Sequence, residues 1–417
     1  MVSATLPAVA VVEGGVALKA RLRRVERARM LKAVALVLPL FAFIMVSFVI
    51  PIGVMLFQSV YDPDISRLMP RTSAEIKRWD GRELPDEATF AALVADLAEA
   101  QKAKKAALIG RRLNYELPGM RSEIVKSARF AIELETGPYK EALIAEAPLW
   151  SDRAAWAVVK RASQRYTPFY YVSAVDLEYD ADDRIVPVSE DEAVYKAVFA
   201  RTLYISLLVT FLTLVMGYPA AYLMATLPAR TGNLLLILVL LPFWTSLLVR
   251  TTAWVVLLQT HGPINDVLMA TGLVSERLQL IFTRFGTIAA MTHIQLPFTL
   301  LPIYSVMKGI SPSHMRAARS LGASSFYAFI RVYLPQTMPG VAAGCLLTFI
   351  LCLGYYITPA LVGGPTDQLV STYIALFTNS TVNWGMGSAL GAMLLVMTLL
   401  LYFVYNRLIG IDRLRLT

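Results

Sequence analysis

Residues 311–335, SPSHMRAARSLGASSFYAFIRVYLP, form a polar island between two long apolar segments. Ser311 is a good N-cap for a helix, and Pro312 suits the first helical position, where the N–H that proline lacks would have no partner. The helix is expected to continue as far as Leu321 and to break at Gly322, because glycine readily adopts backbone conformations that end a helix. This half of the island therefore predicts a short helix that ends at a kink.

A second short helix is expected after the kink, capped by Ser324 or Ser325 and ended by Pro335. Its large apolar residues recur at helical spacing and predict one apolar face: Phe326, Phe329, Ile330 and Tyr333. The arginines of the island face no acidic residue within it: Arg316, Arg319 and Arg331. An ordered, positive and partly apolar helix pair beside apolar segments indicates a docking site, and a plain connecting loop is the alternative.

The spacing of residues in the island resembles the EAA loop of bacterial ABC-importer permeases. That family pattern is Glu-Ala-Ala, three residues, Gly, nine residues, Ile, one residue and Leu-Pro. The matching positions here are Ala317, Ala318, Gly322, Leu334 and Pro335, with Val332 in place of Ile and Arg316 in place of Glu. The resemblance implies that the island forms the coupling helices that insert into ATPase subunits. The neighbouring residues included in this candidate ATPase-coupling site are Arg319, Leu321, Ala323, Phe326 and Phe329.

The composition of the 417-residue chain is unlike that of a soluble globular protein. Hydrophobic residues make up 56% of it and the mean hydropathy is +0.56. The net charge of +9 is unevenly distributed: residues 61–196 hold 20 Lys and Arg against 24 Asp and Glu, and the rest holds 19 against 6. Because the basic residues outside this segment mostly flank apolar stretches, they follow the positive-inside rule of membrane proteins and argue against nucleic-acid binding.

Six apolar segments are expected to cross the membrane: residues 33–58, 199–226, 233–258, 285–308, 338–362 and 385–409. Each exceeds the roughly 20 residues that a bilayer requires. Residues 1–32 are interpreted as a basic cytoplasmic arm that could lie on anionic headgroups, and residues 411–417 as a cytoplasmic tail. The predicted fold class is an all-α polytopic membrane protein of the ABC-importer permease type. Its five-helix core is residues 197–410, and the basic joins place both termini and the island on the cytoplasmic side.

Residues 59–196 are expected to form an extracytoplasmic (periplasmic) insertion of mixed α/β or mainly helical structure. Residues 86–109, 121–135 and 139–165 are expected to be helical, whereas residues 166–179 have the aromatic and β-branched bias of a strand or hairpin. The acidic cluster at the end of this stretch comprises Asp176, Glu178, Asp180, Asp182 and Asp183. It is interpreted as a solvated turn, because it lacks the glycine and terminal glutamate of a calcium-binding loop. The insertion contains neither His nor Cys, so no metal site is predicted.

Arg250 is an unusual residue inside the third apolar segment. It is a candidate pathway or gate residue, because a cation within the membrane normally faces a bundle interior or water. The alternative is a side chain that reaches the outer headgroups. The remaining candidate translocation-pathway residues are Trp244, Thr245, His293, Tyr355, Tyr356 and Pro359. His293 is interpreted as a helix–helix hydrogen-bonding group rather than a proton relay, and the tyrosine pair as either an organic-cation site or part of an aromatic belt.

Residues 242–254, PFWTSLLVRTTAW, and residues 353–368, LGYYITPALVGGPTDQ, look similar to the spermidine and putrescine branch of these permeases. The resemblance covers about residues 197–410. It implies a permease subunit of an ATP-driven, binding-protein-dependent importer in the bacterial inner membrane, for polyamines or a related small organic solute. The implied partners are two copies of an ABC ATPase subunit, which hold ATP and Mg, a second permease subunit, a periplasmic solute-binding protein and membrane lipid.

Catalytic function is not predicted for this chain. It has no glycine-rich loop ending in Gly-Lys-Ser/Thr, so ATP hydrolysis is expected on a separate subunit and no cofactor is expected on this one. One alternative is a secondary transporter or channel without an ATPase, although the apolar segments offer few ionisable groups besides Arg250 and His293. Another is a membrane-anchored enzyme or scaffold that acts through residues 59–196, where no catalytic constellation stands out.

Overall fold

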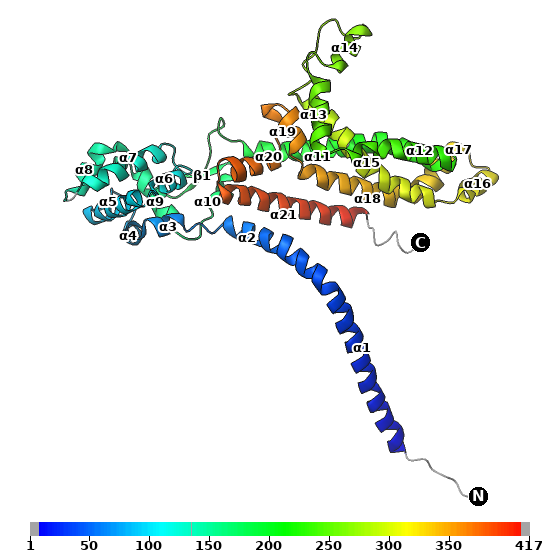
Figure 1. Cartoon of the computed structure of the whole chain (residues 1–417), viewed down its shortest axis with the longest axis horizontal. Coiled ribbons are helices and arrows are strands. Elements are labelled where there is room, and N and C mark those ends of the chain that lie inside the picture. The colour runs from blue at the N-terminus through cyan, green and yellow to red at the C-terminus, as the bar shows by residue number, and fades with distance from the viewer. Residues whose placement is uncertain (1–7, 135, 410–417) are drawn as a thin grey trace. The chain divides into compact units, whose positions relative to one another are not determined.

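The protein, described here by a computed structural model over residues 8–134 and 136–409, is mostly helical (Figure 1). Residues 1–57 and residues 58–417 form two separate compact units. Within the described residues, four helices are long and apolar enough to cross a membrane, or five if one bent helix pair is a single span. The prediction of a helical membrane protein is therefore confirmed, while the finer count of six spans is not established by helix length and composition.

The first unit is one continuous helix. α1 (Ala8–Ile44), a π-helical turn (Met45–Val49) and α2 (Ile50–Gln58) follow one another without a gap, and Figure 1 shows them as a bowed rod. The wide turn ends two residues before Pro51, where its looser hydrogen bonding makes room for a ring that would clash with a regular helical carbonyl. The predicted arm, residues 1–32, thus runs into the first span without a break from Ala8. Its first seven residues, and the side chains of residues 8–24 and 28, lie outside the described part.

Residues 59–196 fold mainly as helices. Their bounds are α3 (Asp64–Leu68), α4 (Pro70–Glu75), α5 (Glu87–Lys102), α6 (Ala106–Leu113), α7 (Met120–Glu133), α8 (Tyr139–Glu146), α9 (Arg153–Ala162) and α10 (Phe169–Ser173). The predicted helix at 121–135 corresponds to α7. Those predicted at 86–109 and 139–165 are each split, the first by a turn with a positive φ of 57° at Lys104 and the second by a 3₁₀ turn that begins with Pro148.

The core of these helices is built from large aromatic residues. Asp86 and Asp152 cap α5 and α9 by accepting backbone N–H bonds, which fixes where each helix begins. The ring of Trp156 then lies 4.6 Å from that of Phe90 and 5.0 Å from that of Trp150, and all three side chains are fully buried. Residues 59–196 therefore contain a hydrophobic core of their own, as expected of a folded insertion.

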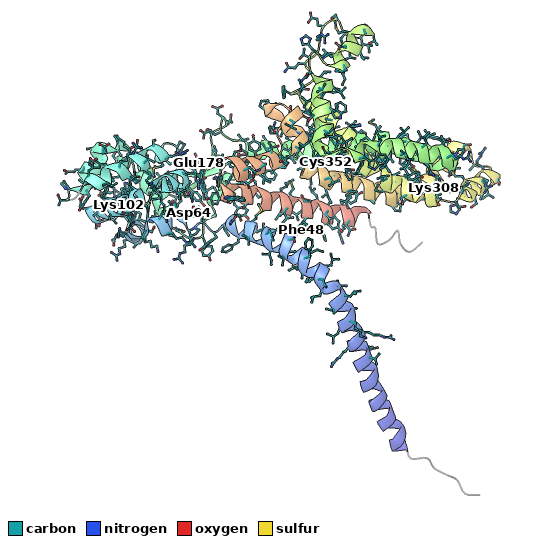
Figure 2. The ribbon with its side chains drawn as sticks, viewed as in Figure 1. Phe48, Asp64, Lys102, Glu178, Lys308 and Cys352 are labelled. Carbon is teal, nitrogen blue, oxygen red and sulfur yellow. The ribbon has the colours of Figure 1, made fainter. Side chains whose placement is uncertain are left out.

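The stretch predicted as a strand or hairpin is divided. Its first part is the helix α10, and only β1 (Leu177–Tyr179) and β2 (Ile185–Pro187) pair, antiparallel, with Glu178 opposite Val186. Figure 2 labels Glu178 in this hairpin. The helix forms because α10 packs its aromatic rings against α21, so tertiary burial outweighs the β propensity of the sequence.

Residues 195–409 supply the remaining helices. Their bounds are α11 (Tyr195–Thr226), α12 (Ala229–Leu240), α13 (Leu247–Leu258), α14 (Pro263–Ala270), α15 (Arg284–Gly309), α16 (Pro312–Ser320), α17 (Ser325–Ala328), α18 (Leu334–Leu353), α19 (Ile357–Val362), α20 (Val370–Ala375) and α21 (Trp384–Ile409). The third predicted segment, 233–258, is not one straight helix. It bends by 95° between Trp244 and Leu247, where Pro242 lies in a 3₁₀ turn and Ser246 caps a new helix.

Helices α11, α15 and α18 pack against one another and run side by side in Figure 1. Thr299 lies at their centre, with its hydroxyl 2.8 Å from that of Thr213 and 2.6 Å from that of Thr348. Gly344 allows the close approach, since a Cβ there would lie 2.5 Å from the Thr299 carbonyl oxygen. Small residues and hydroxyl contacts of this kind hold membrane helices together where there is no hydrophobic drive.

The prediction that Pro335 ends the second island helix is wrong. α17, a π-helical turn (Phe329–Tyr333) and α18 are continuous, and Ser325–Leu353 is a single candidate span. As at Pro51, the wide turn ends two residues before the proline and accommodates its ring. The fifth segment also ends earlier than expected: α18 stops at Leu353, and α19 carries the remainder of the predicted range 338–362.

Candidate functional site

The island folds as its local signals predict. Ser311 caps α16 by accepting the Ser313 N–H, and Pro312 occupies the first turn. Gly322 has a φ of +91°, a left-handed conformation that breaks the helix. Ser324 then accepts the Tyr327 N–H and caps α17. Of the two predicted caps, Ser324 is therefore the one used, and Ser325 is the first residue of the helix. The result is a short helix joined by a tight kink to the helix that becomes α18.

Aromatic rings anchor the island to α11. Tyr222 makes edge-to-face contacts with Phe329 and Tyr333, with ring centroids 5.5 and 5.4 Å apart, and Phe329 and Tyr333 stack at 5.6 Å. Tyr333 is buried and Phe329 half-buried, so this part of the predicted apolar face packs inward. Phe326 and Ile330 do not share that environment, since both are exposed. A kinked pair held this way presents its outer face rigidly.

The outer face of the island combines exposed apolar and exposed positive side chains. Leu321 is 89% and Phe326 74% exposed, at the kink and just after it. Arg316 and Arg319 are exposed on α16, and neither has a side-chain hydrogen bond or ion pair to another described residue. The other predicted coupling residues comprise exposed Ala317 and Pro335 and half-buried Ala318, Ala323, Val332 and Leu334. Lys308, labelled in Figure 2 near the end of α15, adds charge beside them.

The structure brings together three of the predicted pathway residues. The Arg250 guanidinium lies over the Phe243 ring at 5.6 Å, and its Nε is buried without a partner among the described residues. The Trp254 Nε1–H donates to His293 Nδ1 at 3.2 Å, which joins α13 to α15 as a helix–helix hydrogen bond. Arg250 is near enough to both His293 and Tyr355 to interact electrostatically. Trp254, one turn beyond Arg250, was not singled out from the sequence.

The remaining pathway candidates lie apart or serve the backbone. The side chains of Trp244 and Tyr356 are exposed, and the Thr245 hydroxyl donates to the Pro242 carbonyl at 2.7 Å. Pro359 is buried, and its carbonyl accepts a hydrogen bond from the Gln368 side chain at 3.3 Å. The Thr251 and Thr358 hydroxyls, 3.1 Å apart, join α13 to α19 in the same region.

The acidic cluster near the hairpin is not simply a solvated turn. Asp176 is only 4% exposed, and its carboxylate accepts the backbone N–H groups of Val194, Tyr195 and Lys196 at 2.7–2.9 Å. It therefore caps the N-terminus of α11, where the helix dipole favours a negative charge. Elsewhere in the cluster, hydrogen bonds from the Arg184 and Asp182 backbone lower the pKa of Asp180. Among the described residues, no group of His, Cys, Asp and Glu is arranged to hold a metal ion.

A buried charge network joins α6, α9 and α10, and the sequence did not reveal it. Arg112 donates to Asp62 and Glu116, and Glu116 also accepts from Arg161 at 3.1 Å. Tyr170 donates to Asp62 at 2.7 Å, and burial raises the pKa of Tyr170 well above its usual value. Most of these ionic groups pair with one another within the insertion, whereas the buried Nη2 of Arg112 has no hydrogen-bond partner among the described residues.

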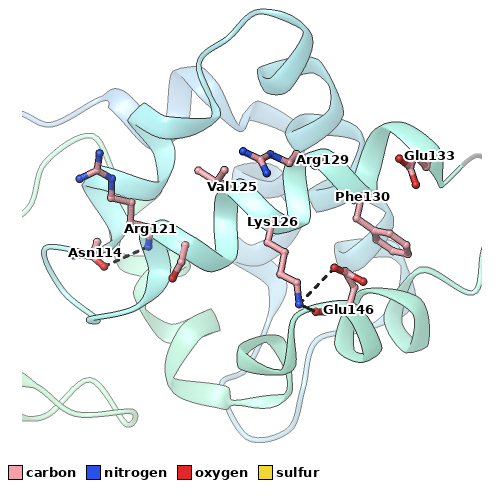
Figure 3. A pocket seen from close by; sticks show the side chains of 9 residues that line it. Asn114, Arg121, Val125, Lys126, Arg129, Phe130, Glu133 and Glu146 are labelled. Atoms are coloured by element: carbon pink, nitrogen blue, oxygen red, sulfur yellow. Dashed lines mark hydrogen bonds and ion pairs between the residues drawn. The ribbon is translucent and has the colours of Figure 1, made fainter.

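A surface groove of about 770 Å³ lies along α7 (Figure 3). Figure 3 shows Arg121, Lys126 and Arg129 projecting from this helix, with Lys126 pointing toward Glu146. The Lys126 ammonium forms a 3.4 Å ion pair with Glu146, and the Asn114 side chain accepts the Arg121 backbone N–H. The described residues that line the groove include no nucleophile–base pair.

The comparisons with known proteins concern the helices of residues 195–409. A family described as "Binding-protein-dependent transport system inner membrane component" matches residues 197–411. The spermidine/putrescine transport system permease protein PotB of Haemophilus influenzae is 38% identical over 213 residues, which cover 51% of this chain and 74% of that protein. PotB of Escherichia coli K12 is 34% identical over 216 residues, which cover 52% of this chain and 78% of that protein.

Among solved structures, the chain is similar to a bacterial ABC transporter involved in the import of the acidic polysaccharide alginate, with 21% identity and a TM-score of 0.42 over 55% of this chain and 81% of that one. The resemblance to ABC-importer permeases is confirmed by the family match, which includes the island and the α11, α15 and α18 bundle. These helices are those of a transport subunit and not of an enzyme, and the chain belongs to the family of inner membrane components of binding-protein-dependent transport systems.

Proposed function

We propose that the chain is the permease subunit of an importer for polyamines such as spermidine and putrescine. The observation that carries the proposal is the exposed island of residues 311–335, a rigid kinked helix pair whose outer apolar and positive side chains have no partner among the described residues. The similarity to PotB proteins over 213 and 216 residues supports the solute class. Two ATPase subunits carrying ATP and Mg, a second permease subunit and a periplasmic solute-binding protein complete the proposed complex.

The proposed topology has six spans, with both termini and the island in the cytoplasm and residues 59–196 outside. The charge distribution supports it, since the basic joins flank the proposed cytoplasmic ends. In this arrangement α12 and α13 together make the third span despite their bend, and α15 makes the fourth. The backbone of the bend is largely exposed in this chain, so in the proposed topology the second permease subunit covers it or it lines a watery cavity, because irregular backbone is not tolerated against lipid.

Closure of the ATPase subunits on ATP would move the island, and the island would move the bundle. Tyr333 and Phe329 connect the island to α11 through Tyr222, and the continuous helix from Ser325 to Leu353 connects it to the middle of the bundle. A displacement of the island is therefore a displacement of α18. ATP binding would then favour one of two bundle conformations, the requirement for alternating access.

The proposed pathway lies beside Arg250, His293 and Tyr355, where α13, α15 and the α18–α19 junction meet. The aromatic rings of Trp254 and Tyr355 can attract an organic cation by about 0.5–2 kcal/mol each. The Arg250 guanidinium lies over the Phe243 ring, and this cation–π contact fixes the position of its positive charge.

The test is reconstitution of the chain in nanodiscs with its ATPase, its second permease subunit and its binding protein. Spermidine-loaded binding protein is expected to stimulate ATP hydrolysis, and labelled spermidine should accumulate in proteoliposomes only with ATP. Uptake that persists without the ATPase would support the secondary-transporter alternative instead. Stimulation by another solute but not by spermidine or putrescine would refute the polyamine assignment and leave the permease assignment intact.

A further inference from the structure

The polar groups of the island are largely satisfied within it, and the exceptions are informative. Ser311 and Ser324 bond to helix N-termini, Ser320 donates to the Arg316 carbonyl at 3.0 Å, and His314 contacts Gln336 at 2.8 Å. Arg331 lies over the Tyr327 ring at 5.9 Å. Arg316 and Arg319 remain, exposed and unpaired with any other described side chain.

These two arginines lie on one side of α16. Their spacing of three residues places neighbouring side chains on the same helical surface, and no acidic residue of the island can neutralise them. The exposed Leu321 and Phe326 follow directly, so a positive patch adjoins an apolar one. A partner that buries Leu321 and Phe326 must therefore also bind the guanidinium groups of Arg316 and Arg319.

We propose that the island docks into a groove of the nucleotide-binding subunit that presents carboxylate groups to Arg316 and Arg319 and an apolar surface to Leu321 and Phe326. This inference rests on the proposed function and specifies its partner. A groove lined by cations would bring like charges together on docking, which is strongly unfavourable once water is excluded. Carboxylates would instead form bidentate hydrogen bonds with guanidinium groups and fix the register of the helix.

Rigidity favours a protein groove over a lipid surface. Two side-chain caps, a glycine kink and the stack of Phe329 on Tyr333 hold the island in one shape. A defined shape is needed to fit a groove and transmit force, whereas basic segments bind anionic headgroups mainly by summed charge. Binding of the arginines to anionic lipid is therefore the competing outcome of the experiment.

The experiment measures assembly of the nanodisc-embedded permease with the purified nucleotide-binding subunit, for wild type and single variants of Arg316 and Arg319. Arg316→Ala and Arg319→Ala are expected to weaken assembly about two- to fivefold, as for exposed ion pairs. Arg316→Glu and Arg319→Glu should weaken it roughly tenfold or more, because attraction becomes repulsion. Raising the salt concentration should weaken wild type more than the Ala variants. Arg230→Glu changes an exposed arginine in the first turn of α12; it is the matched control and should assemble as wild type does.

A reciprocal change completes the test: a groove carboxylate of the nucleotide-binding subunit replaced by Lys should restore assembly with Arg316→Glu or Arg319→Glu. If wild type assembles but the Glu and Ala variants behave alike, the charge inference is wrong and the proposed function stands. Binding of anionic phospholipid is measured in nanodiscs with and without phosphatidylglycerol. If the Glu variants lose this lipid binding but still assemble with the nucleotide-binding subunit as wild type does, the partner of the arginines is lipid and the inference is also overturned. Failure of wild type to assemble at all would refute the proposed function itself.

Discussion

Gly322 shows how one residue shapes the island. A Cβ at this position would meet no atom within 4 Å, so a larger side chain has room, but the φ of +91° strains any residue other than glycine. The strain is about 1–2 kcal/mol for an L-residue in a left-handed conformation. The kink thus depends on the backbone of Gly322 and not on the space around it.

Gly322→Leu is therefore expected to abolish or strongly reduce uptake while leaving membrane levels unchanged, and Gly322→Asn should retain more activity because Asn tolerates this conformation better. Gly309→Leu is the control, since Gly309 also has open space but lacks a positive φ. Uptake and complex formation are measured together. Normal uptake by Gly322→Leu at wild-type levels would contradict a coupling role for the kink.

The buried carboxylate of Asp96 makes the stability of the protein depend on pH. Its carboxylate is buried and accepts both the backbone N–H and the hydroxyl of Thr72, at 2.7 and 2.8 Å. Burial nevertheless raises the pKa of Asp96 above its usual value, and the Thr72 hydrogen bonds only partly oppose that shift. The folded state therefore binds the proton more tightly than the unfolded chain does, so the stabilising contribution is complete at low pH and is lost as the pH rises through the folded-state pKa.

We expect the free energy of unfolding of wild type to increase relative to that of Asp96→Asn as the pH falls from 7 toward 4, so that wild type gains stability on acidification. Asn keeps an acceptor for Thr72 but does not titrate, which isolates the protonation effect. Thermal unfolding of the purified protein across this range measures it. A difference that shrinks on acidification would show that the carboxylate is stabilised in its charged form instead.

At the scale of an element, Asp176 ties the insertion to the start of α11. Three backbone N–H groups at that helix N-terminus depend on one carboxylate. Gly385 adds a second close contact, since a Cβ there would lie 2.3 Å from the Tyr170 ring, which brings α10 directly against α21. The insertion and the helices of residues 195–409 are thus joined by specific contacts, which agrees with their forming one compact unit.

Asp176→Ala is expected to destabilise the protein by about 0.5–2 kcal/mol, the usual loss for an N-cap, and toward the upper end because three donors lose their acceptor. The thermal midpoint of the detergent-solubilised protein reports the change. Glu178→Ala is the control, because Glu178 is exposed and lies two residues away in β1. Equal midpoints for the two variants would argue that water replaces the carboxylate without loss.

At the scale of the whole molecule, the proposed orientation can be tested on the insertion. Ser122 is exposed beside the groove of Figure 3, so a cysteine introduced there is accessible to reagents. An impermeant thiol reagent is expected to label Ser122→Cys in intact cells with permeabilised outer membranes. The native Cys345 and Cys352 are half-buried and buried, and the chain without the added cysteine measures their background. Labelling only after lysis would place residues 59–196 in the cytoplasm.

Features that depend on neighbouring residues could be predicted from the sequence. The caps at Ser311 and Ser324, the break at Gly322 and the position of Pro312 were predictable because each rests on one or two turns of backbone. The family could be recognised for a similar reason, since the coupling motif occupies one short stretch. Apolar length likewise indicated a membrane protein without any knowledge of packing.

Features that depend on residues far apart in the chain could be known only from the tertiary structure. The Asp176 carboxylate caps a helix that begins 19 residues later, and Trp254 meets His293 from a different helix 39 residues away. The bend between α12 and α13, the burial of Tyr333 beside exposed Phe326, and the continuation of the helix past Pro335 likewise depend on which surfaces pack together. Apart from proline, local propensity differs among such alternatives by about 1 kcal/mol or less, so the burial of a single large side chain, about 1.5–3 kcal/mol, is enough to decide between them.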